Sequence, residues 1–188
     1  MAAIDPVRRH RLTVDDFHKL ASTGVICEDA RVELIDGELI DMAPIGSRHA
    51  GMVYLLNHLL TTALSDKAIV GAQNPVVLGI HSQPQADILV LRRREDYYRS
   101  SHPTPEDVLL LVEIVDTTGE YDRKVKIPLY ARHEIPELWL VDLTKNCLEI
   151  YRTPQPKHQS YRQVELCYEG VVSPLHLPSV AIDVARLF

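Results

Sequence analysis

The chain has 188 residues, 46% of them hydrophobic and 24% charged, which is typical of one globular domain (1–188) with a sizeable core and excludes a disordered protein. It has no apolar run near the length of a membrane helix and no secretory signal, so we expect a cytoplasmic protein that spans no membrane. The net charge of −6 disfavours binding to nucleic acid by counterion release, although arginines cluster at 92–94.

The N-terminal part of the chain predicts an extension, a helix and a hairpin. We expect residues 1–12 to be flexible and Thr13 to cap a short helix that ends near residue 20. Two segments of alternating polarity flank Asp36-Gly37, between residues 31 and 40. An Asp-Gly pair between such segments is a strong hairpin signal.

The middle of the chain predicts a long helix followed by strands. From 47 to about 64, apolar residues recur at helical spacing, which predicts the longest helix, packed with one side against a sheet. Three strand-like runs follow, at 76–78, 87–91 and 108–115. The last run is so apolar that we expect it in the middle of the sheet.

The last third of the chain predicts a helix and then further strands. The helix spans 122–133, and Pro128 means that it either begins near Val125 or bends there. Strands follow at 137–142, at 148–151 and, after a loop at 154–156, at an edge over 161–168. This order of elements predicts a mixed α/β sheet flanked by helices, with an N-terminal hairpin.

Glu113 interrupts the otherwise apolar run 108–115. A buried ionised carboxylate is costly unless it meets a cation, although a glutamate that reaches solvent or pairs with an arginine explains the sequence equally well. Asp87, which begins another apolar strand, favours the first interpretation, because carboxylates on neighbouring strands can converge on Mg²⁺ or Mn²⁺. Taken alone, Asp87 is an ordinary strand-start aspartate.

Lys126 supplies a third polar group. On a regular helix it shares a face with Asp122. A lysine beside metal-bound water can orient that water and stabilise charge on a phosphoryl oxygen. A solvated lysine paired with Asp122 is the ordinary alternative, and Lys124 competes for the same role.

These residues stand in an ordered set of motifs: VELIDGE at 32–38, His49, PQADI at 84–88, VEIVD at 112–116, YDRKVKIPLYA at 121–131 and IPELWLVD at 135–142. In this order and spacing the set resembles the Uma-two family of restriction endonuclease-like proteins, a branch of the PD-(D/E)XK nuclease superfamily. The resemblance covers most of the chain. It implies a restriction endonuclease-like fold and a site for a divalent metal.

The resemblance also implies a catalytic centre of four polar side chains: Asp87, Glu113, Glu33 and Lys126. The three carboxylates would be metal ligands, and His49 would be accessory. The superfamily's lysine normally stands two residues after the glutamate, where this chain has Val115, and the resemblance implies that Lys126 takes its place. Ala86 stands where the family usually has proline.

The sequence therefore favours a Mg²⁺- or Mn²⁺-dependent endonuclease acting on DNA, with RNA the less favoured substrate. Lys126 would position the attacking water, and Glu33 would bind a second ion or orient water. The alternative is a non-catalytic module that keeps the nuclease fold and binds nucleic acid or a protein, with the same residues as a structural ion network. The acidic charge and Val115 motivate that alternative. A homodimer is expected by analogy with related folds.

Other constellations have little support. A glycoside hydrolase using Glu33 and Glu113 would give Lys126 no role and would need no metal. The nine histidines form no zinc motif, and the widely spaced Cys27, Cys147 and Cys167 predict reduced thiols. The basic and aromatic residues of 92–99 could contact nucleic acid, but a solvated loop is the favoured interpretation.

Overall fold

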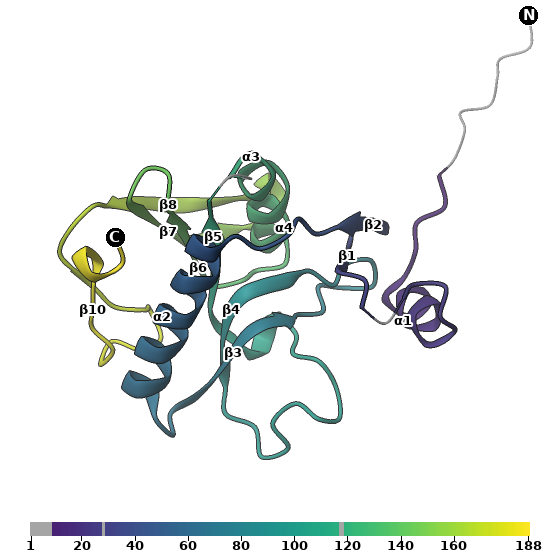
Figure 1. Ribbon diagram of the computed structural model, residues 1–188, viewed down its shortest axis with the longest axis horizontal. Helices are drawn as coiled ribbons and strands as arrows, with labels where there is room; N and C mark the ends of the chain where they lie inside the picture. The colour runs from purple at the N-terminus through teal and green to yellow at the C-terminus, as the bar shows by residue number, and fades with distance from the viewer. Residues whose placement is uncertain (1–8, 28, 117–118) are drawn as a thin grey trace, which may run out of the picture.

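The computed structural model describes residues 9–27, 29–116 and 119–188, and its central feature is a six-stranded sheet (Figure 1). In spatial order the strands are β3 (Ala68–Pro75), β4 (Gln85–Arg92), β5 (Val108–Val115), β6 (Glu137–Asp142), β7 (Cys147–Gln155) and β8 (Ser160–Cys167). The pair β5–β6 is parallel and the other four pairs are antiparallel. Every residue of β5 is buried, which confirms the central strand predicted at 108–115.

Two layers cover the sheet and bury separate cores. The helix α2 (Ser47–Leu64) packs on one face through Met52, Leu56 and Leu60, and the C-terminal segment with β9 (Val171–Val172), β10 (Ile182–Asp183) and a short 3₁₀ turn (Val184–Arg186) joins the same core. The other face is covered by α4 (Ile127–Arg132). Among the described residues, no helix has the length and apolar character needed to cross a membrane.

The N-terminal elements lie on the side of the molecule away from the C-terminus (Figure 1). Thr13 caps α1 (Val14–Ser22) and exchanges hydrogen bonds with Asp16, which confirms the predicted helix start. The hairpin of β1 (Val32–Ile35) and β2 (Glu38–Asp41) turns at Asp36-Gly37, as predicted. Of the predicted extension, residues 1–8 lie outside the described residues, and the Leu12 N–H donates to the Gly37 carbonyl at 3.0 Å.

Gly37 offers a direct test of how the segment before α1 docks on the hairpin. Its φ is +82°, and a Cβ added there would lie 2.6 Å from the Arg11 Cβ, whereas Gly24 has a similar φ of +75° and open surroundings. We expect Gly24→Ala to lower the free energy of unfolding by about 1 kcal/mol and Gly37→Ala by about 2–3 kcal/mol, because the second substitution also displaces Arg11. Urea denaturation measures both, and equal losses would contradict the docking.

The strand predicted at 76–78 is wrong. The edge strand is β3, which ends at Pro75, and Val76 and Leu78 are buried in an irregular segment that follows it. Their apolar character reflects burial under the sheet and not strand pairing. The strand β3 contains a glycine, an asparagine and a terminal proline. These residues are depleted in strands, so the composition of the segment does not predict one.

The helix predicted at 122–133 differs in its internal geometry. It follows α3 (Gly119–Tyr121) and contains a π-helical segment, Asp122–Lys126, before α4 begins. The Ile127 N–H donates to the Asp122 carbonyl, so the turn ahead of Pro128 is widened, and the helix does not begin near Val125. The loop predicted at 154–156 is also wrong at its start, because β7 continues to Gln155 and pairs there with Ser160.

Candidate active site

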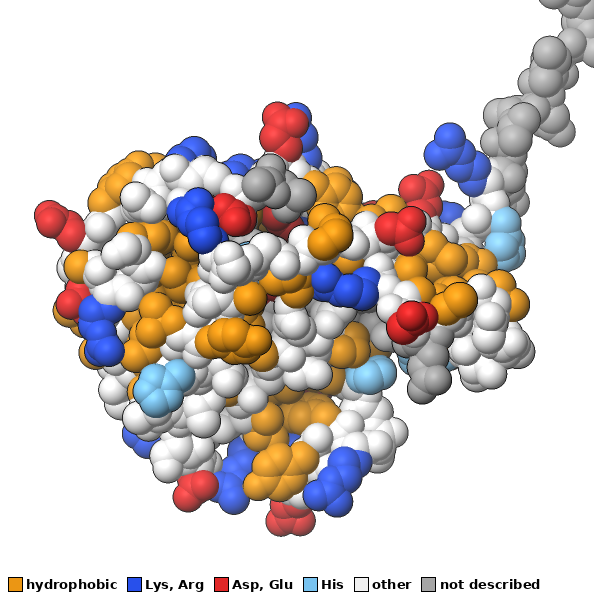
Figure 2. Space-filling view, in the orientation of Figure 1, with side chains coloured by type: hydrophobic (Ala, Val, Ile, Leu, Met, Phe, Trp, Pro, Cys, Tyr) orange, Lys and Arg blue, Asp and Glu red, His pale blue; other side chains and the backbone are white. Residues whose placement is uncertain are grey.

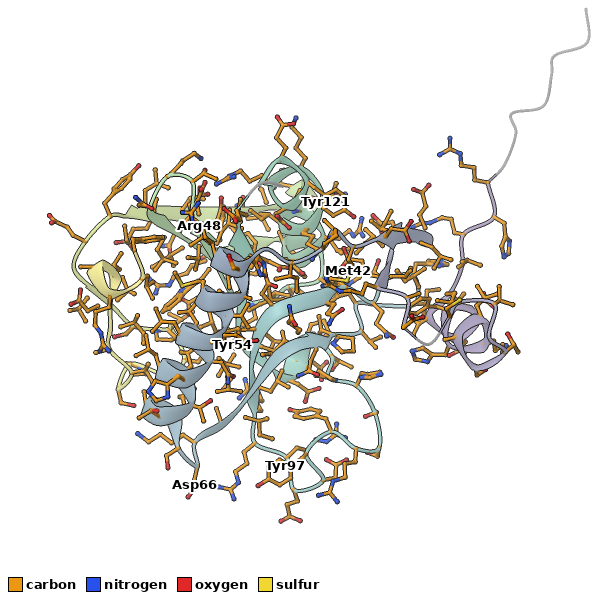
Figure 3. All side chains as sticks on the ribbon, in the orientation of Figure 1. Met42, Arg48, Tyr54, Asp66, Tyr97 and Tyr121 are labelled. Atoms are coloured by element: carbon orange, nitrogen blue, oxygen red, sulfur yellow. The ribbon has the colours of Figure 1, made fainter. Side chains whose placement is uncertain are left out.

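A cleft of about 390 Å³ contains all five side chains predicted for the site: Glu33, His49, Asp87, Glu113 and Lys126. They come from β1, α2, β4, β5 and the π-helical segment, in that order. In Figure 3, Met42 and Tyr121 mark two further segments that line the cleft, and Arg48 lies at the N-terminal end of α2. The fold thus assembles the site from segments far apart in the sequence.

The antiparallel register of β4 and β5 brings Asp87 and Glu113 together. Ile88 pairs with Val112, so the residues one position outside this pair are neighbours on adjacent strands. The Asp87 N–H faces the Glu113 Oε2 at 3.4 Å, and the Ile114 N–H donates to the Asp87 Oδ2 at 2.8 Å. The backbone therefore fixes the Asp87 carboxylate beside Glu113, as the hypothesis of converging carboxylates requires.

Lys126 lies inside the cleft, whereas Lys124 lies outside it. The Lys126 Nζ is 3.2 Å from the Glu113 Oε1 and 3.3 Å from the Glu33 Oε2, and its side chain is 8% exposed. The Lys124 Nζ pairs with Glu120, and the Lys124 side chain is 70% exposed. Of the two lysines that the sequence left open, the structure brings Lys126 to the carboxylates.

Glu33 and Glu113 are further fixed by neutral partners. The Gln85 N–H donates to the Glu33 Oε2 at 3.1 Å. The hydroxyl of Tyr130, which is fully buried, donates to the Glu113 Oε1. Sequence reasoning assigned no role to Tyr130, although a tyrosine in an otherwise apolar stretch needs a partner for its hydroxyl when buried. Tyr130 therefore fixes the orientation of Glu113.

Asp122 is a second residue whose place sequence reasoning missed. It lines the cleft and is 8% exposed. Across the described ranges its carboxylate has no hydrogen-bond or ion-pair partner, because the Lys126 Nζ contacts Glu33 and Glu113 instead. The ordinary alternative, a solvated Lys126 paired with Asp122, is thus not what the structure shows, and a fourth carboxylate lines the cleft.

The cleft holds more negative charge than its lysine can neutralise. Burial raises the pKa of Glu113 to about 8; Lys126 opposes this shift, and the neighbouring Asp87 adds to it. Burial likewise raises the pKa of Asp122 to about 6, again against the effect of Lys126. The carboxylates in turn raise the pKa of Lys126, so it stays protonated despite its burial. Such a cluster favours the entry of a further cation.

His49 connects the cleft to α2. Its Nε2 lies 3.0 Å from the Asp87 Oδ2. Burial lowers the pKa of His49, but the hydrogen bond to Asp87 and the surrounding carboxylates outweigh this effect, and the net shift is upward. The Nδ1 of His49 and the hydroxyl of Tyr121 are buried and have no hydrogen-bond partner within the described part of the chain. Both residues line the cleft and could bond to a ligand.

The donor set suits a hard divalent cation. Within the described ranges, no three His, Cys, Asp or Glu side chains are grouped closely enough to enclose a metal ion by themselves. Asp87 and Glu113 are adjacent, and Asp122 faces the same cleft. Mg²⁺ and Mn²⁺ prefer oxygen ligands, keep several waters, and are commonly held by one or two carboxylates together with substrate phosphates. The residues present therefore fit such an ion.

The mixed sheet with flanking helices defines a protein of the restriction endonuclease-like class. A family model described as "Putative restriction endonuclease" (Uma2) matches residues 14–185, and the chain belongs to this family. A solved structure titled as "a putative nuclease belonging to DUF820" from Anabaena variabilis ATCC 29413 has a TM-score of 0.70 and 18% identity, and covers 94% of this chain and 97% of that chain. No curated protein matches the chain. The nuclease-like fold predicted from the sequence is confirmed.

Proposed function

We propose that this protein is a divalent-metal-dependent endonuclease that hydrolyses phosphodiester bonds of DNA. The proposal rests mainly on the cleft, where Glu113 and Glu33 contact Lys126, Asp87 lies beside Glu113, and the carboxyl groups outnumber the lysine. When bound, Mg²⁺ or Mn²⁺ would supply a Lewis acid that polarises a phosphoryl oxygen and lowers the pKa of a water. Membership of the Uma2 family supports nucleic acid as the substrate class.

The polar residues of the cleft would have different roles in hydrolysis. Asp87 and Glu113 would hold the cation, and Asp87 is positioned for this by the Ile114 N–H and by His49. The protonated Lys126 would donate to a phosphoryl oxygen and orient the attacking water. Glu33, held by the Gln85 N–H, would orient water or bind a second ion. Each group is thus fixed before substrate arrives, which reduces the reorganisation needed during the reaction.

A cleavage assay on labelled DNA tests the proposal. We expect cleavage with Mg²⁺ or Mn²⁺ that EDTA abolishes and that falls by at least about 10²- to 10³-fold in Asp87→Ala and Glu113→Ala. Glu120→Ala is the matched control, because that carboxylate is 88% exposed on the neighbouring helix and should be dispensable. Undiminished cleavage by folded Asp87→Ala protein would contradict the assigned site.

A specific observation favours a second candidate, a non-catalytic module. The Lys126 ammonium already contacts Glu33, Glu113 and the Gln85 carbonyl, as a purely structural ion network would require. In that case, alanine at Asp87, Glu113 or Lys126 should each lower the melting temperature. In an active centre with excess negative charge, removal of a carboxylate should leave the melting temperature unchanged or raise it.

Two sequence predictions remain part of this proposal: a cytoplasmic location and a homodimer. The edge strand β8 offers a surface for the second, because Val164, Leu166 and Tyr168 alternate along it and its end and are exposed. Light scattering after size exclusion measures the mass in solution. A monomer at concentrations used for cleavage would contradict the dimer and leave the assigned site untouched.

A further inference from the structure

The cleft has two chemically different parts. One part carries the carboxylates and Lys126, and the other is lined by apolar residues of β2 and of a covering segment, defined here as residues 42–46. Apart from the acidic Asp41, the lining residues of this part are apolar: Ile40, Met42, Ala43, Pro44, Ile45 and Gly46. Arg31 holds the covering segment in place, since its carbonyl accepts from the Met42 N–H at 2.8 Å and its guanidinium donates to the Ala43 carbonyl at 3.2 Å. A ligand would thus meet an acidic and an apolar surface together.

The apolar part is not needed to bind a metal ion or a phosphate. A volume of about 390 Å³ is comparable with pockets for small organic ligands. Nucleobases have apolar faces that pack on apolar and aromatic side chains, and Tyr121 also lines the cleft. The size and the chemistry of the cleft therefore match one nucleotide, with its phosphate at the carboxylates and its base at the covering segment.

Polar groups around the cleft fit the remainder of such a ligand. The Tyr121 hydroxyl and the His49 Nδ1, which have no partner within the described ranges, could bond to the edge of a base or to a phosphate oxygen. Arg31 lines the cleft, and Arg48 lies beside it, paired with the lining residue Asp116 at 3.1 Å. Two arginines near one cleft suit the phosphates that flank a bound nucleotide.

The charge distribution of the protein does not favour binding of an intact duplex. Lys and Arg side chains on the face shown in Figure 2 are scattered among acidic and apolar ones and form no continuous basic band. The net charge is −6. Duplex DNA is bound largely by neutralisation of many phosphates. A base paired and stacked in a duplex would have to be unpaired and flipped out to reach the covering segment, which is unfavourable.

We propose that the substrate is single-stranded DNA, of which one nucleotide enters the cleft with its base against the covering segment. This inference rests on the proposed function and narrows its substrate. Met42 contributes to the apolar surface and not to the metal ligands, so it selects the strand without taking part in hydrolysis. One active site is sufficient to cut a single strand, so this substrate does not require a two-fold dimer of the protein.

Fluorescence anisotropy with Ca²⁺ in place of Mg²⁺ tests the inference without requiring cleavage. We expect a labelled single-stranded oligonucleotide to bind at least about tenfold more tightly than the duplex of the same sequence, because the duplex must be unpaired. Met42→Asp should weaken single-strand binding by at least about tenfold, the effect of losing base packing. Tyr54→Asp is the control, since Tyr54 is 75% exposed on α2 and lies outside the cleft (Figure 3).

The outcomes separate the single-strand inference from the proposed endonuclease function. Equal or tighter duplex binding, or no effect of Met42→Asp in a variant that keeps its Mn²⁺ affinity and melting temperature, would overturn the inference. Tighter binding of the matching RNA strand would overturn the choice of DNA. Met42→Ser serves as a milder variant if the aspartate impairs folding. Single-strand preference without Mn²⁺ binding or cleavage would instead remove the proposed endonuclease function and leave a binding cleft.

Discussion

Lys126→Met is expected to lower the free energy of unfolding by about 3–5 kcal/mol above about pH 8, where Glu113 is ionised. The lysine contacts both Glu113 and Glu33, and methionine would leave two buried carboxylates without this cation. The loss should shrink below about pH 8, where Glu113 takes up a proton instead of remaining charged. Urea denaturation at several pH values measures the effect.

Lys124→Met is the matched control, because Lys124 stands two residues earlier and pairs with the exposed Glu120. Its substitution should change the free energy of unfolding by less than about 1 kcal/mol at any pH. Equal losses from the two lysine substitutions would contradict the assignment of Lys126 to the cleft. Equal losses of cleavage would contradict its proposed role in hydrolysis.

Glu113→Gln is expected to flatten the dependence of stability on pH in the metal-free protein. The pKa of Glu113 is raised in the folded state from its ordinary 4.5 to about 8, chiefly by burial. Because the pKa is higher in the folded state, the protonated carboxyl stabilises the folded protein, and this stabilisation is complete below the unfolded-state pKa. The stabilisation is lost as the pH rises through the folded-state pKa. Wild-type protein should therefore lose about 3 kcal/mol relative to Glu113→Gln between about pH 5 and about pH 8.

Asp122 shifts in the same direction, so the comparison must use the difference between wild type and Glu113→Gln at each pH. Thermal melts in EDTA provide it, with Glu120→Gln as an exposed control. Added Mn²⁺ should raise the melting temperature of the wild type near pH 8 and leave Glu113→Gln largely unchanged. A pH-independent difference in EDTA would show that Glu113 is not a strained buried acid.

The sequence predicts those elements whose local pattern also determines their burial. The run 108–115 is apolar throughout and forms the buried central strand, and Glu113 is conspicuous because it interrupts that run. The predicted helix 47–64 is α2, because its apolar spacing matches the face that packs on the sheet. Thr13 and Asp36-Gly37 act through local backbone geometry, which a short segment encodes completely.

The parts that the sequence does not predict depend on tertiary context. The strand β3 has an unfavourable composition and is held by its pairing with β4. The choice between Lys124 and Lys126 depends on the π-helical segment, whose wide turn regular helical spacing cannot anticipate. Tyr130 gains its place from its long-range contact with Glu113, and Asp122 from the cleft that distant segments assemble, neither of which a local pattern records.

Calorimetric titration of Mn²⁺ into the wild type and into Asp87→Ala tests the central claim most directly. We expect the wild type to bind the ion and Asp87→Ala to lose at least about tenfold to a hundredfold in affinity, because a positioned carboxylate ligand is removed. The Ile114 N–H and His49, which hold Asp87, remain in the variant, so the change isolates the ligand itself. Equal binding by both proteins would contradict a metal centre at Asp87.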